Sequence, residues 1–157
     1  MFNAQIRNNS MMTTDEVIQA LNSFVPEERS ADDNISYFHE LMEALKHDAD
    51  RERAIEPIFR LIERHPHIDY GSPGPLAHTL ESFHELYHEH LFASLDRLPT
   101  PLTVWMLNRL TNADQNYLEH KMLIEKMHAL LQHPRLDDLT RGAVEDFVDF
   151  QDHPGEE

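Results

Sequence analysis

Two histidines stand four residues apart, with a glutamate directly after the first, in the segment HELYH at 84–88. The spacing matches H-E-x-x-H, in which an α-helix presents both imidazoles to one zinc ion and the glutamate activates zinc-bound water. His84, Glu85 and His88 are therefore the residues that a zinc-dependent hydrolase would use. Weak metal binding by His84, His88 and His90 is a second interpretation of the same segment.

Other features of the sequence argue against a working zinc site. The second histidine is followed by a charged residue, Glu89, where zinc-protease helices usually keep an uncharged one. No glycine and third histidine follow at metzincin spacing, and no strand pattern would supply a substrate-binding edge. Because the chain is rich in histidine and glutamate, a chance match is not rare in comparison with true zinc enzymes. We therefore expect structural histidines, with no catalytic residue, no metal and no cofactor.

The composition removes most other catalytic classes. The chain has only four glycines, at 71, 74, 142 and 155, and they do not form a dinucleotide fingerprint, a phosphate-binding loop or a G-x-S-x-G nucleophile elbow. The absence of cysteine excludes disulfides, thiolate metal sites and cysteine nucleophiles. We predict that the protein is not an enzyme.

Charge points instead to a protein partner. The chain carries 29 acidic and 13 basic residues, a formal net charge of −16, which repels nucleic-acid phosphates and anionic membranes. We therefore expect a basic protein partner, with no nucleic acid and no membrane. From position 137 to the end, eight acids stand against the single base Arg141. The predicted partner-binding residues are Asp137, Asp138, Glu145, Asp146 and Asp149.

Apolar periodicity predicts an all-α fold of about eight short antiparallel helices in a HEAT-like stack. The predicted helices cover 13–25, 33–46, about 55–62, 76–98 as one helix or two, 101–110, 112 or 114 to 132, and 138–150. A capping box from Thr13 to Glu16 opens the first helix, and Thr100 caps the helix that begins at Pro101. We expect one domain over 1–157, with flexible tails at 1–12 and 152–157, in the cytoplasm.

The same patterns predict which side chains are buried. Met122 is expected to fill the core, and Leu139, Ala143, Val144 and Phe147 form the predicted buried side of the last helix. The arginines near the third helix alternate with glutamates, which predicts a solvated, salt-bridged face and not a phosphate site. These residues are Arg51, Glu52, Arg53, Glu56, Arg60, Glu63 and Arg64.

Two segments together resemble motifs of a known family: DYGSPGPL at 69–76, and PTP at 99–101 followed by TVWMLNR at 103–109. With the helix between them at 87–97, they resemble a family of small helical bacterial immunity proteins, encoded beside polymorphic or contact-dependent growth-inhibition toxins. The resemblance covers about 55–112. We expect both segments to determine the fold, with Trp105 filling the centre.

The resemblance implies a stoichiometric inhibitor that binds the C-terminal domain of a cognate secreted toxin, often a basic nuclease. An acidic helical protein is a plausible complement to such a domain. The leading interpretation is therefore an immunity protein. A zinc-dependent hydrolase and a generic acidic helical adaptor are the alternatives.

Overall fold

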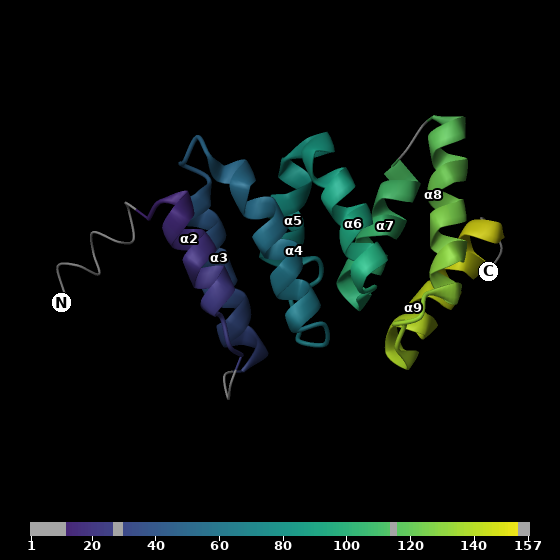
Figure 1. Ribbon diagram of the computed structural model, residues 1–157, viewed down its shortest axis with the longest axis horizontal. Coiled ribbons are helices and arrows are strands. Elements are labelled where there is room, and N and C mark those ends of the chain that lie inside the picture. Colours follow the sequence, from purple (N-terminus) through teal and green to yellow (C-terminus); the bar gives the residue numbers. More distant parts are fainter. Residues whose placement is uncertain (1–11, 27–29, 114–115, 154–157) are drawn as a thin grey trace. The chain divides into compact units, whose positions relative to one another are not determined.

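The computed structural model describes residues 12–26, 30–113 and 116–153. Within these ranges the chain forms eight α-helices, three 3-10 helices and no strand, which confirms the all-α prediction (Figure 1). The α-helices are α2 (Thr14–Ser23), α3 (Ala31–Leu45), α4 (Ile55–Arg64), α5 (Gly74–Ser82), α6 (His88–Arg97), α7 (Pro101–Ala113), α8 (Tyr117–Ala129) and α9 (Asp138–Asp152). The 3-10 helices are η1 (Arg51–Ala54), η2 (His84–Tyr87) and η3 (Leu130–Gln132).

The chain divides into two compact units, residues 1–90 and 91–157, and the boundary falls within α6. The single domain over 1–157 stays a prediction. Of the predicted tails, residues 1–11 and 154–157 lie outside the described residues, whereas Asp152 is the last residue of α9. None of the helices in the described part of the chain is long and apolar enough to cross a membrane.

The first unit is built from helices that pack in pairs. α2 packs against α3 and α4, and α3 packs against α5. The predicted capping box opens α2: the Glu16 amide donates to Thr13 Oγ1 over 3.2 Å, and the Thr13 amide donates to Glu16 Oε1 over 2.9 Å. Phe38 of α3 and Phe59 of α4 are fully buried. Burial of such aromatic side chains supplies much of the stability of this unit.

An ordered turn connects α4 to α5. Tyr70 is buried and donates its hydroxyl to the His65 carbonyl over 2.7 Å. Gly71 has a φ of +104°, and a Cβ there would lie 2.6 Å from the Gly74 Cα, so the turn requires glycine. The predicted turn is therefore present in the first unit, and α5 begins at its Gly74. Its role as a determinant of the fold stays a prediction.

In the second unit α7, α8 and α9 all pack against one another, and Figure 1 shows them in green to yellow. Thr100 caps α7 as predicted, because its Oγ1 accepts the Thr103 amide over 3.2 Å. Val104, Met106 and Leu107 are fully buried, whereas Trp105 is only partly buried. The expectation that Trp105 fills the centre is wrong: its ring lies 4.8 Å from the Arg109 guanidinium.

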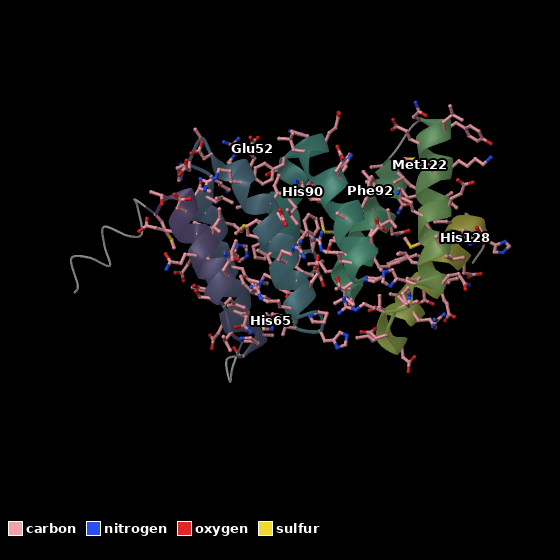
Figure 2. All side chains as sticks on the ribbon, in the orientation of Figure 1. Glu52, His65, His90, Phe92, Met122 and His128 are labelled. Carbon is pink, nitrogen blue, oxygen red and sulfur yellow. The ribbon has the colours of Figure 1, made fainter. Side chains whose placement is uncertain are left out.

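The buried sides of α8 and α9 differ from those predicted. Met122, labelled on α8 in Figure 2, is 45% exposed, while Leu123 and Met127 are buried. On α9, Val144 is buried as predicted, but Leu139 is 61% exposed. Apolar residues occur on more than one side of each helix, so the periodic pattern alone did not select the side that packs.

Candidate partner-binding surface

The HELYH segment does not lie on one α-helix. α5 ends at Ser82, His84 has a φ of +58°, and residues 84–87 form the 3-10 helix η2 before α6 begins at His88. Of the two predicted alternatives for 76–98, two shorter helices are found. H-E-x-x-H chemistry needs both histidines one turn apart on one α-helix, so this segment does not form the required geometry.

The side chains of the segment are separately placed. His84 and Glu85 are exposed, whereas His88 is partly buried and packs its ring edge-on against Tyr87, with centroids 4.7 Å apart. His90, labelled in Figure 2, is partly buried. In the portions of the chain that the structure describes, no three His, Asp or Glu side chains form a group that could hold a metal ion.

The predicted partner-binding residues come together on α9. Asp137 is the N-cap of this helix, with its Oδ1 accepting the Thr140 amide over 2.8 Å. A carboxylate in this position satisfies a free amide and interacts favourably with the positive end of the helix dipole. Asp137 therefore has a structural role at the start of α9, which distinguishes it from the other four acids.

Those four acids form an exposed surface. Asp138, Glu145 and Asp149 follow one another at intervals of seven and four residues, which places them on one side of an α-helix. Asp146 lies beside them, and all four side chains are exposed. The buried residues Thr140 and Val144 lie on the opposite side. We call Asp138, Glu145, Asp146 and Asp149 the α9 acidic face.

Among the described residues, no cation neutralises the α9 acidic face. The only base within α9, Arg141, donates to the Leu131 carbonyl over 3.4 Å. Asp152 is the α9 carboxylate that does find a partner, with its Oδ1 lying 3.1 Å from His128 Nε2. Within residues 12–26, 30–113 and 116–153, the four carboxylates of the face have no hydrogen-bond or ion-pair partner.

This charge arrangement is unfavourable within the helix itself. Glu145 and Asp149 are like charges four residues apart, a spacing that destabilises a helix by a few tenths of a kcal/mol. Asp149 also lies in the last turn of α9, where the dipole favours cations, and that turn holds no base. A basic partner would remove both penalties, whereas water only screens them.

Exposed apolar side chains border the α9 acidic face. Leu139, Asp146 and Phe150 follow one another at the same seven- and four-residue intervals, so they form a parallel line along the helix. Leu139 is 61% exposed and Phe150 is 52% exposed. Sequence reasoning missed this line because it assigned Leu139 to the buried side.

A side-chain amide network fixes the end of α9 that carries Asp149 and Phe150. Gln151 Nε2 donates to Asn108 Oδ1 and to Asn112 Oδ1 of α7, each over 2.8 Å. Amide pairs of this kind contribute about 1 kcal/mol and hold the helix in one rotational setting. No spacing in the sequence signals this network, because its partners are about forty residues apart.

Comparisons with protein-family models, with curated proteins and with solved structures find no match for this chain.

Proposed function

We propose that this protein is a stoichiometric inhibitor of a basic protein, in the role of an immunity protein that neutralises a cognate secreted toxin domain. The observation that carries the proposal is the α9 acidic face, whose four carboxylates have no partner in the described part of the chain. Its proposed binding residues are Asp138, Glu145, Asp146 and Asp149.

The charge of the face supports rapid binding of a basic partner. Clustered carboxylates attract a cationic surface over about 8 Å at physiological salt and so raise the rate of productive encounters. A nuclease domain presents such a surface because it binds phosphates. The formal charge of −16 on the whole chain adds to this attraction.

The apolar border supports a tight complex after the encounter. Phe150 and Leu139 would be desolvated against the partner, and buried aromatic and aliphatic anchors inside a polar rim commonly dominate binding energy. The hydrogen bonds of Gln151 to α7 hold the backbone of this end of α9 before binding, which lowers the entropy that association costs.

The resemblance of the central segments to small helical immunity proteins narrows the kind of partner. It supports a cytoplasmic protein that binds the C-terminal domain of a toxin and blocks its active site or a neighbouring surface. Because the motifs at 69–76 and 99–109 set a turn and a helix start, the proposed binding surface rests on α9 and not on the motifs.

Co-expression with the candidate toxin domain tests the proposal. The C-terminal domain of a large secreted protein encoded next to this chain should kill cells when expressed alone and be tolerated together with it. The triple variant Glu145→Lys, Asp146→Lys, Asp149→Lys should lose protection. For the purified proteins, it should slow association at least tenfold and flatten the salt dependence of the rate.

A matched control reverses three exposed acids of the first unit, Glu40, Glu85 and Glu89, to lysine. This variant changes the net charge by the same amount and should keep protection. It also removes the glutamate that a zinc hydrolase would need, so loss of protection in the control alone would favour the hydrolase. Killing by the toxin domain despite the wild-type protein would refute the immunity proposal.

A further inference from the structure

A cleft of about 440 Å³ opens within the first unit between α3, η1 and α5. Its size falls in the range of small-molecule sites, which is about 300–1,000 Å³. The cleft lies in a different unit from α9, so it is not explained by the proposed partner-binding surface.

The inner wall of this cleft is apolar. Met42 and Leu45 of α3 line it together with Pro75 and Phe83 from α5 and its C-terminus. All four side chains are buried, with exposed fractions of at most 7% for Met42, Leu45 and Phe83. A hydrocarbon chain or ring lying on them would lose water contact at about 25 cal/mol per Å².

Several side chains with nitrogen donors lie on the rim of the cleft, which is unusual in so acidic a chain. His39, Lys46, Arg51 and His78 line it, and Glu43 is the one carboxylate among the lining residues. Glu43 Oε2 lies 3.1 Å from Lys46 Nζ, so these two charges compensate each other. The net cationic character of the rim therefore comes from Arg51, with the two imidazoles as further donors.

Arg51 has donors available. Its Nη1 donates to the Asp48 carbonyl over 3.4 Å, an uncharged acceptor. In the stretches of chain that the structure describes, no carboxylate lies within ion-pair distance of this guanidinium. The remaining N–H groups of a guanidinium form a planar fork that matches a carboxylate.

We propose that this cleft binds a small organic monoanion with an apolar body and one carboxylate. The carboxylate binds to Arg51, and the body lies on Met42, Leu45 and Phe83. A single uncompensated cation suits one negative charge, whereas Glu43 and the overall negative charge of the chain disfavour polyanions. The site is independent of the α9 acidic face.

Octanoate is the test ligand, and the methionine methyl groups are the reporters. Titration of protein labelled at its methionine methyls should shift the Met42 signal in the first unit and leave the buried Met106 signal of the second unit unchanged. Octanol, which lacks the charge, should bind at least tenfold more weakly. Inorganic phosphate, which lacks the apolar body, should not shift Met42.

Arg51→Gln should weaken octanoate binding about tenfold or more, because a hydrogen bond to a charged group is lost. Arg51→Lys should retain part of the affinity, and Arg60→Gln, at an exposed position on α4, should retain all of it. Circular dichroism establishes that each variant is folded. An unmoved Met42 signal, equal binding of octanol, or an unchanged affinity in folded Arg51→Gln would overturn the proposal.

Discussion

α4 in the first unit and α9 in the second are both charged surface helices, but they use their charges differently. α4 buries five of its ten residues, and its Arg60 lies 3.3 Å from Glu56 and 3.8 Å from Glu63. α9 buries two of its fifteen residues and leaves the four carboxylates of its acidic face without partners in the described chain. A helix with compensated charges and a wide buried side serves the fold, whereas uncompensated like charges beside exposed apolar groups suit binding.

The charges on the two helices also contribute differently to the free energy of folding. Ion pairs on α4 add little to stability, because exposed pairs contribute about 0–1 kcal/mol each. The like charges on α9 subtract a comparable amount. The charges of α9 are therefore a net cost to folding, whereas those of α4 are not.

The largest expected effect is the difference in stability lost when one phenylalanine of each helix is replaced by alanine. Phe59 of α4 is fully buried and Phe150 of α9 is 52% exposed. Phe59→Ala should lower the free energy of unfolding by about 3–5 kcal/mol because it opens a cavity, whereas Phe150→Ala should change it by less than about 0.5 kcal/mol. Urea denaturation measures both. Equal losses would show that α9 packs as tightly as α4.

The stability of the first unit should decrease at alkaline pH because of Tyr70. Burial raises the pKa of the Tyr70 phenol above its ordinary value, although the Arg64 guanidinium opposes the shift. Since the folded pKa exceeds the unfolded value of about 10, the stabilisation is complete below pH 10 and is lost as the pH rises above it. Tyr70→Phe should therefore flatten the decline in unfolding free energy above pH 10.

The same variant should cost about 1 kcal/mol at neutral pH, because the hydrogen bond to the His65 carbonyl is lost. Tyr117→Phe, at a position of α8 that is 75% exposed, is the control and should leave the profile as in the wild type. A decline above pH 10 that is equally steep in Tyr70→Phe would contradict the assignment.

The caps of α2 and α9 should contribute similar amounts to the free energy of unfolding, although they lie in different units. Thr13→Ala removes the capping box of α2, and Asp137→Ala removes the N-cap of α9. Each should lower the free energy of unfolding by about 1 kcal/mol. If Asp137→Ala also slows binding of the proposed basic partner more than Asp138→Ala does, the Asp137 carboxylate contributes to the proposed interface as well as to the helix.

The smallest expected effect comes from reversing one charge on each helix, which should change the free energy of unfolding in opposite directions. Asp149→Lys should raise the free energy of unfolding by about 0.3–1 kcal/mol, because it places a cation near the C-terminus of α9 and four residues after Glu145. Arg60→Glu on α4 should lower it by about 0.5 kcal/mol, because two ion pairs become repulsive. Thermal denaturation at low salt measures both. A loss of stability in Asp149→Lys would mean that the acidic face is not electrostatically strained.

Much of the local structure was predictable because its causes lie within a few residues. Thr13 caps α2 through Glu16, Thr100 caps α7 through Thr103, and Arg60 pairs with glutamates one turn away on either side. The acidic residues of α9 were likewise visible as a concentration of charge. Their partner-binding role stays a prediction, and Asp137 proved to be the N-cap.

Other features required contacts that no local pattern contains. No glycine or proline marks the break at His84, although histidine is among the few residues that adopt a positive φ with some frequency. Leu139 and Met122 had the spacing of buried residues and are exposed. Side-chain spacing says which residues share a helix face, but packing against other helices decides which face is covered.

The sequence by itself determined that the chain is helical, where several helices begin and that its acids gather near the C-terminus, because capping, periodicity and charge are local properties. Only the tertiary structure decided that the four acids of the α9 acidic face lack partners among the described residues, that Phe150 and Leu139 border them, and that Arg51 lies on the rim of an apolar cleft. Each of these depends on which distant segments approach one another, and that is set by the packing of whole helices.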